Sequence, residues 1–224
     1  MRSMADASGL TQPHVAEPTL PAVGTRRPKG RTARTRTAVL TATLTELAAH
    51  GYERLTLDGV ATRAGVHKTT VYRRWGSKEH VVADALRTLA ATRIEVPDTG
   101  DLDRDLQLLA RSVVTALSSP DGAGTVRAMV SGAHDSEVVR GIVATFWAQR
   151  TDDAGEIVRR AVERGQLPPG SSPAQVIRHL GAPLYHQLLV TLDPLTIADA
   201  DLAAGAVAAA ARAGAFVAAA DPRP

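Results

Sequence analysis

The densest group of hydrogen-bond donors in the chain lies between Lys68 and Arg74, in the run Lys-Thr-Thr-Val-Tyr-Arg-Arg. Guanidinium, ammonium and hydroxyl groups read base edges in the major groove of DNA and hold its phosphates. An arginine that makes two hydrogen bonds to guanine contributes about 1–3 kcal/mol of discrimination against another base. These residue types predict a surface for duplex DNA. Arg73 and Arg74 suit guanine, and Lys68 suits groove contacts at a helix start. Thr69 or Thr70 suits a phosphate or a thymine methyl group, and Tyr72 and Lys78 suit phosphates.

The neighbouring residues predict a helix-turn-helix that would hold these donors in place. Thr56 can cap a short helix at 57–64, and Gly65 supplies the backbone freedom for a tight turn. A second helix follows at 67–75, where Val71 and Trp75 are four residues apart and would anchor one face in a small core. Donors on the other faces of this second helix would then point outward.

A structural role competes with DNA contact at some of these positions. Arg74 could be solvated or could pair with Glu79, and Tyr72 could belong partly to the core. His67 reads better as a helix-start residue than as a direct DNA contact.

Charge is distributed unevenly along the 224 residues. Residues 1–25 hold one basic and two acidic side chains, residues 26–95 hold 14 and 6, and residues 96–224 hold 11 and 15. A basic segment followed by an acidic one is typical of a nucleic-acid module joined to a domain that need not touch phosphate. The arm at 26–36 contains six Arg and Lys residues and no acid, so phosphate or minor-groove contact and a merely solvated tail are both open for it.

Several protein classes are disfavoured by what the sequence lacks. The chain has no cysteine, which excludes disulfides, thiolate zinc sites and cysteine nucleophiles. It has no apolar run of 18 residues that would predict a membrane span. No His-Glu-x-x-His, P-loop or Gly-x-Ser-x-Gly motif occurs, and the fragment Gly122-Ala-Gly124 reads as a turn. We therefore expect no enzyme activity, no cofactor and no metal, and a cytoplasmic protein that joins the nucleoid when bound to DNA.

Hydrophobic periodicity and capping residues predict an all-α fold. We expect a disordered tail at 1–25, a DNA-binding domain with its basic arm at 26–95, and a larger helical domain at 96–224. The expected helices span 32–50, 57–64, 67–75, 78–95, 101–117, 122–133, 136–164, 173–192 with a kink at Pro183, and 196–219.

The run from Leu55 to Glu79 resembles the DNA-binding segment of the tetracycline-repressor (TetR) family. The resemblance combines a Thr-capped helix, an Ala-Gly-Val turn, a Thr-Val-Tyr-Arg-Arg-Trp helix and a Ser-Lys-Glu helix start, and it extends over about 36–89. The phrases Glu-Arg-Gly-Gln-Leu at 163–167 and Gly-Ala-Pro-Leu-Tyr at 181–185 are similar to one C-terminal variety of the family. One departure is Asp58, a carboxylate where some relatives place a polar or basic DNA contact. By matching positions, the resemblance implies that Lys68, Thr69, Thr70, Arg73 and Arg74 lie on the recognition helix, while Thr56, Tyr72 and Lys78 hold the DNA backbone.

The resemblance also implies a homodimeric repressor that a small molecule releases from its operator. The small residues of the last two helices, 173–192 and 196–219, suit a dimer interface, although they would also suit packing within one chain. Phe146 and Trp147 are adjacent and point about 100° apart on a helix, so we do not expect both to face one pocket squarely. The candidate ligand-binding residues, each of which could equally be ordinary core, are Met129, Phe146, Trp147, Tyr185 and His186.

Three other interpretations stay open at this stage. The protein could activate transcription or regulate without a ligand. It could be a structural or RNA-binding helical protein, which sequence-specific binding to duplex DNA would argue against. It could also be a helical enzyme, although no catalytic constellation supports that reading.

Overall fold

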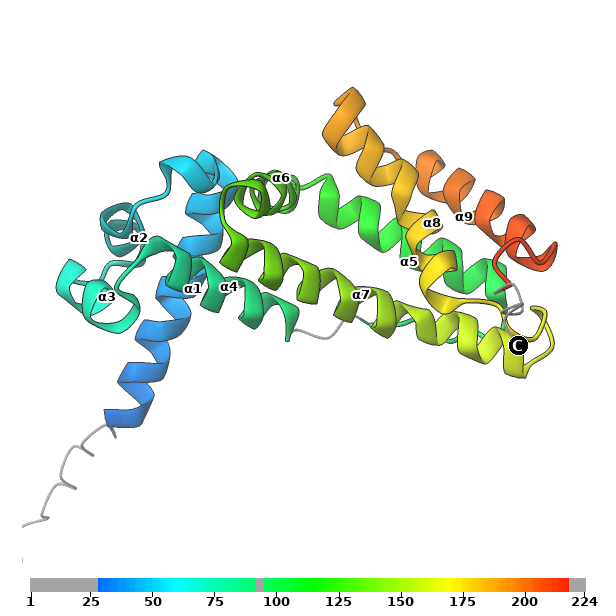
Figure 1. The fold of residues 1–224 in the computed structure, drawn as a ribbon, viewed down its shortest axis with the longest axis horizontal. Coiled ribbons are helices and arrows are strands. Elements are labelled where there is room, and N and C mark those ends of the chain that lie inside the picture. Colours follow the sequence, from blue (N-terminus) through cyan, green and yellow to red (C-terminus); the bar gives the residue numbers. More distant parts are fainter. Residues whose placement is uncertain (1–27, 92–94, 218–224) are drawn as a thin grey trace, which may run out of the picture.

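The computed structural model describes residues 28–91 and 95–217. The predicted tail at 1–25, together with Arg26 and Arg27 of the basic arm, lies outside the described residues. Figure 1 shows an elongated molecule, with α1 to α4 at one end and α8 and α9 toward the other. The helices are α1 (Pro28–Arg54), α2 (Leu57–Ala64), α3 (Lys68–Trp75), α4 (Lys78–Ala90), α5 (Leu102–Leu117), α6 (Pro120–Asp135), α7 (Glu137–Glu163), α8 (Pro173–His186), the π-helix η1 (Gln187–Thr191) and α9 (Ile197–Arg212).

The all-α prediction is confirmed for the described parts of the chain. They contain no strand, and an isolated antiparallel bridge joins Ser171 to Val217. No helix within 28–91 and 95–217 combines the length and apolar character that crossing a membrane requires.

Local capping chemistry sets most helix starts. Thr56, Ser77, Asp101, Ser136, Ser172 and Thr196 each accept a backbone N–H of the following first turn through their side chains. Such a bond satisfies one of the N–H groups that a helix start leaves without an intrahelical partner. The starts predicted from these residues are therefore correct to within a residue.

Several predicted boundaries need correction. The first helix begins at Pro28 rather than 32, so much of the predicted arm is its opening turns. Gly51 has a non-helical backbone (φ 75°), as expected of a stop, but the chain is helical again from there to Arg54. Gly122 and Gly124 lie inside α6, so the turn expected for that fragment is wrong.

The last two helices differ from the predicted ones in type or length. Beyond Pro183, α8 continues to His186 and then widens into η1, which a left-handed Leu192 (φ 60°) terminates. A proline removes one backbone donor from the helix, and π-turns are one way in which a helix absorbs such a disturbance. The final helix ends at Arg212, where 219 was expected.

Two large clusters of buried side chains form the core. The first joins α1 to α4 and continues into α6 and α7 through Ala128, Met129, Val139, Ile142, Val143 and Phe146. The second is built from α5, the C-terminal part of α7, α8 and α9. Because the first cluster continues into α6 and α7, the group of α1 to α4 packs on the rest of the molecule through α1 and α4.

Candidate nucleic-acid interface and apolar cavity

The turn between α2 and α3 depends on Gly65. Its φ of 64° is left-handed, and the amides of Gly65 and Val66 donate to the carbonyls of Thr62 and Ala61 at 3.2 and 3.1 Å. This closes α2 and reverses the chain within three residues. His67 then caps α3, since its Nδ1 lies 3.4 Å from the amide of Thr69.

Two buried side chains fix the orientation of α3, the second helix of the helix-turn-helix. Val71 is fully buried and Trp75 is 7% exposed. The Trp75 indole donates to Asp84 Oδ2 at 3.0 Å, and the guanidinium of Arg36 binds the other oxygen of the same carboxylate at 2.5 Å. Asp84 on α4 therefore ties α3 to α1, and Arg36, which we counted in the basic arm, is a structural ion-pair partner.

Burial raises the pKa of Asp84, but the hydrogen bonds from Arg36 and Trp75 and the nearby guanidinium groups outweigh it. The net result is a pKa below the usual value for an aspartate. The carboxylate of Asp84 is therefore charged when it links α3 to α1.

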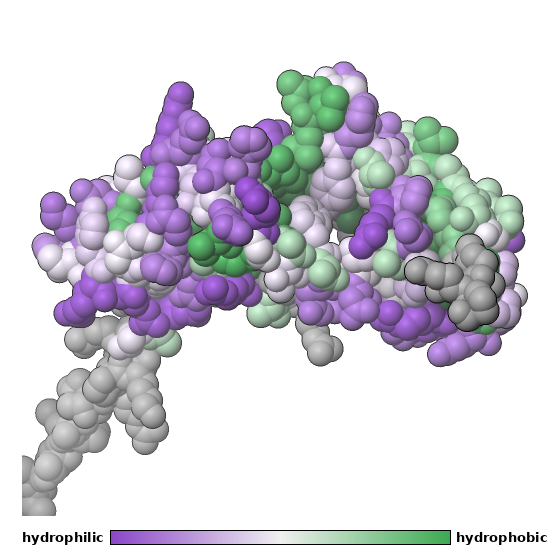
Figure 2. Space-filling view, viewed as in Figure 1, coloured by the Kyte–Doolittle hydropathy of each residue, from purple (hydrophilic) through white to green (hydrophobic). Residues whose placement is uncertain are grey.

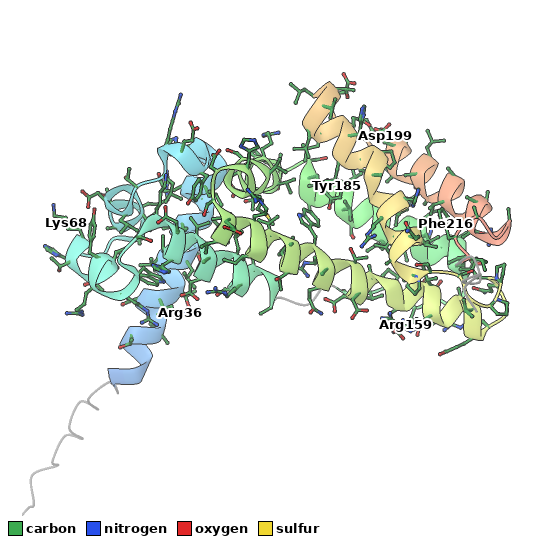
Figure 3. All side chains as sticks on the ribbon, in the orientation of Figure 1. Arg36, Lys68, Arg159, Tyr185, Asp199 and Phe216 are labelled. Carbon is green, nitrogen blue, oxygen red and sulfur yellow. The ribbon has the colours of Figure 1, made fainter. Side chains whose placement is uncertain are left out.

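The outer face of α3 carries the predicted donors. Lys68, Thr69, Tyr72, Arg73 and Arg74 are exposed, and Thr70 is half-buried. Arg73 sits midway between Val71 and Trp75 in sequence, which places it opposite the buried face. Figure 3 shows Lys68 at the tip of α3, on the edge of the molecule farthest from α9.

Some of these donors already have partners. Thr69 Oγ1 lies 2.8 Å from His67 Nδ1, and the Arg74 guanidinium stands 5.2 Å from the centroid of the Trp75 ring. The Lys78 ammonium donates to the carbonyls of Tyr52 and Glu53 at 3.3 and 3.4 Å, above the Tyr52 ring. The positive charge of Lys78 thus stabilises the partial negative charge of the carbonyls at the C-terminal end of α1.

A cavity of about 990 Å³ lies between the helix-turn-helix and the far end of the molecule. Its walls come from α1, the end of α4, α5, α6, α7, α8 and η1, and they are mainly apolar. Thr41, Leu44 and Thr45 bring α1 into its wall, and Leu89 brings in the end of α4. No group of three or more His, Cys, Asp or Glu side chains in the described parts is arranged to hold a metal.

Four of the five candidate ligand residues line this cavity: Met129, Phe146, Trp147 and Tyr185. His186 does not; it is exposed, because it follows Tyr185 by one residue and turns away from the interior. Phe146 and Trp147 were not expected to face one pocket together. Both line this cavity, which is wide enough to be reached by side chains that point in different directions. The rings of Phe146, Trp147 and Tyr185 form a row of edge-to-face pairs, each with centroids 5.1 Å apart.

Sequence reasoning missed Arg150, which also lines the cavity. The signal available was its spacing, since it follows Phe146 by one helical turn and its guanidinium stands 5.2 Å from that ring. The Thr41 and Leu89 contributions had no local signal, because they depend on how α1 and α4 pack against α6 and α7.

Comparison with known proteins decides the family. Residues 39–85 match the description "Bacterial regulatory proteins, tetR family", and residues 96–210, which make up more than half of the chain, match "Tetracyclin repressor-like, C-terminal domain". The chain belongs to the tetracycline-repressor family. It is a transcriptional regulator with a helix-turn-helix DNA-binding segment, and it is not an enzyme.

Three relatives illustrate the range of the TetR family around this chain. The HTH-type transcriptional regulator AqdR of Rhodococcus erythropolis is 33% identical over 156 residues, which cover 70% of this chain and 75% of AqdR. The crystal structure of the TetR family regulator SCO0332 is 28% identical, with a TM-score of 0.59 over 79% of this chain and 97% of that one. A complex of SmeT with triclosan shares the fold at 23% identity, with a TM-score of 0.57 over 85% and 98% of the two chains.

Proposed function

We propose that this TetR-family regulator is a homodimeric repressor that binds a near-palindromic operator through α3 and leaves it when a small molecule enters the cavity. The observation that carries the proposal is the combination of two features in one chain. An exposed face of donors lies on α3, and an apolar cavity has α1 and α4 in its wall. A ligand in such a cavity can alter the position of the DNA-binding helices by direct contact.

The proposed DNA contacts divide into two kinds. Arg73, Arg74 and Lys68 would read base edges, because their side chains are long, cationic and exposed. Thr56, Thr69, Thr70, Tyr72 and Lys78 would hold the backbone and fix the register of α3 in the groove. The exposed Arg34 on α1 supports a further phosphate contact from the basic arm.

Exposed apolar side chains at η1, which extends α8, and on α9 support dimerisation through the last two helices. Val190, Leu192, Ile197 and Leu202 are between 46% and 74% exposed. Figure 2 shows hydrophobic surface at the tip beyond α8 and over α9, whereas the surface around α1 to α4 is mainly hydrophilic. Apolar groups of this size gathered at one end of a molecule are typical of a protein–protein contact.

The proposed mechanism is a shift between two conformations. A two-fold dimer would place its recognition helices in successive major grooves, about 34–36 Å apart. A ligand that binds more tightly to a conformation with a different spacing lowers operator affinity by the ratio of its two affinities. The SmeT–triclosan complex supports an apolar effector for this cavity, which is large enough for a drug-sized molecule.

The division of the chain at 95/96 into a DNA-binding unit and an effector-binding and dimerisation unit is part of this proposal. The proposal also places the protein in the cytoplasm, on the nucleoid when DNA is bound.

The test is enrichment of genomic fragments by the purified protein, followed by binding to the enriched duplex with and without candidate effectors. The expected result is a two-fold-related sequence upstream of a gene whose transcription rises when the regulator is deleted. Transcription that falls on deletion would indicate an activator. Equal retention of all fragments would contradict sequence-specific regulation.

A further inference from the structure

Few charged residues line the cavity, and they differ in how deeply they are buried. Asp121 and Arg178 line it from exposed positions near the surface. Arg150 is half-buried on α7, and its Nη2 donates to the carbonyl of Leu89 at 3.0 Å. This bond holds a positive charge at the end of the cavity nearest to α4.

Apolar surroundings make that charge significant. The Phe146 ring packs against the Arg150 guanidinium, and Leu89 and Trp147 line the same region of the cavity. A cation in apolar surroundings interacts more strongly with an opposite charge than it would in water. A guanidinium carries five N–H donors in a planar arrangement, so it can bind an anionic oxygen group in addition to the Leu89 carbonyl.

A second donor, Tyr185, lies at the other end of the row of rings and is near enough to Arg150 to be affected by its charge. The Tyr185 ring of α8 packs edge-to-face on Trp147 of α7. Burial raises the pKa of Tyr185 to about 12, against a smaller opposing effect of Arg150. The phenol therefore keeps its proton near neutral pH and can donate a hydrogen bond to an anion.

We propose that the effector is an apolar molecule with one anionic oxygen group, such as a carboxylate or a sulfonate, and that Arg150 and Tyr185 recognise this group. This inference rests on the proposed function of the cavity and specifies the class of its ligand. A cationic drug of the same shape would meet Arg150 as a like charge. An uncharged one would not form the charge-assisted hydrogen bond that Arg150 can donate to an anion.

The test uses two fluorescent probes that share a ring system. Anilinonaphthalenesulfonate carries a sulfonate, and N-phenylnaphthylamine has the same anilinonaphthalene ring system without the sulfonate. Titrations of the full-length protein should give about tenfold tighter binding for the sulfonate probe, as expected for a charge-assisted bond. Arg150→Gln should remove most of that preference while changing the affinity for N-phenylnaphthylamine by less than about twofold.

Three further variants separate a specific site from general effects. Arg178→Gln removes an equal charge from the exposed rim and should leave the preference intact. Tyr185→Phe should weaken the sulfonate probe about threefold and leave the neutral probe unchanged. Arg150→Lys retains the charge and should keep part of the preference, so it also serves as the test if the glutamine variant does not fold.

Several outcomes would overturn the inference. The first is that the unaltered protein binds both probes with equal affinity. The second is that a folded Arg150→Gln protein loses affinity for both probes equally. The third is that Arg178→Gln loses the preference for the sulfonate probe as fully as Arg150→Gln does. Operator binding is measured separately for each variant. A protein that binds operator DNA without preferring the sulfonate probe contradicts only the ligand class, whereas one that binds no duplex contradicts the proposed function.

Discussion

Arg73 is the residue best placed to distinguish one base from another. It is exposed and lies opposite the buried pair Val71 and Trp75 on α3. Replacement by Ala should therefore change which bases are preferred at one position in each half-site and cost about 1–3 kcal/mol of binding free energy there. Selection of bound sequences from a randomised operator library measures this directly.

Tyr72→Phe is the matched comparison for Arg73→Ala. Tyr72 is 48% exposed, and the substitution removes only its hydroxyl group, which we assign to a phosphate. Binding should weaken by a similar factor for every sequence in the library, because phosphate contacts do not depend on the base. If the two variants alter the library in the same way, the division between base-reading and backbone-holding residues is wrong.

Asp84 makes the stability of the helix-turn-helix depend on pH. Its pKa is lower in the folded chain than its ordinary value of 3.8. The carboxylate therefore adds stability above that value, and this stability is lost as pH falls through the folded-state pKa. Asp84→Asn should lower the free energy of unfolding by about 1.5 kcal/mol near neutral pH and by much less in acid.

Urea unfolding at several pH values, followed by Trp fluorescence, tests this expectation. Asp193→Asn provides the control, because Asp193 is exposed in the segment before α9. It should change the free energy of unfolding little at any pH. A stability loss in Asp84→Asn that is the same in acid as at neutral pH would rule out the assigned ion pair.

At the scale of elements, α6 joins the two parts of the molecule by packing closely on α1. A Cβ added at Gly124 would lie 2.4 Å from the carbonyl oxygen of Ala48. Gly124→Ala must therefore push two helix backbones apart, and it should lower the free energy of unfolding by about 1–3 kcal/mol. It should also disturb ligand response, because the cavity lies beside this contact.

Gly141→Ala is the control for this contact. Gly141 is exposed in α7, and an added Cβ would meet nothing within 4 Å. The substitution should stabilise the protein by up to about 1 kcal/mol through helix propensity. Thermal unfolding of both variants gives the comparison, and equal effects of the two would show that the α1–α6 contact is not close.

The helix starts were predictable from sequence because capping is a local interaction. Ser136 and Thr196 bond to amides three residues away, so the relevant partners lie within one short window. The outward face of α3 was predictable for a similar reason, since Val71 and Trp75 fix its orientation. The change from α8 to the π-helix η1 and the end of α9 were not predictable, because Pro183 gives no local signal for a π-helix and the alanine-rich stretch has no sharp stop signal.

The cavity was only partly predictable. Its aromatic residues were identified by type, but Leu89 and Thr41 come from distant segments whose position depends on tertiary packing. Residue type also pointed to His186, but it directly follows Tyr185, and adjacent helical residues point in different directions. Arg150 was overlooked because a lone arginine on a helix is usually solvated.

At the scale of the whole molecule, dimerisation should depend on the apolar end. Leu202 is 74% exposed on α9, so Leu202→Glu should place a charge in the proposed interface and yield a monomer at concentrations where the unaltered protein is a dimer. Light scattering coupled to size-exclusion chromatography measures the mass. Val138→Glu, at a residue that is 53% exposed at the start of α7, should remain dimeric.

The monomeric variant should also lose operator affinity, because each α3 would bind its half-site alone. A dimer that survives Leu202→Glu, or a monomer that binds the operator as tightly as the unaltered protein does, would place the interface elsewhere.

The central claim is that α3 enters the major groove and that Arg73 bonds to guanine there. Methylation protection reports on guanine N7, which faces that groove, and therefore tests the claim most directly. With saturating protein on the enriched operator, guanines should be protected in two half-sites about one helical turn apart. Arg73→Ala should expose one guanine in each half-site and leave the remaining protection in place. Guanines that stay reactive under saturating protein, or an unchanged pattern in Arg73→Ala, would contradict the account.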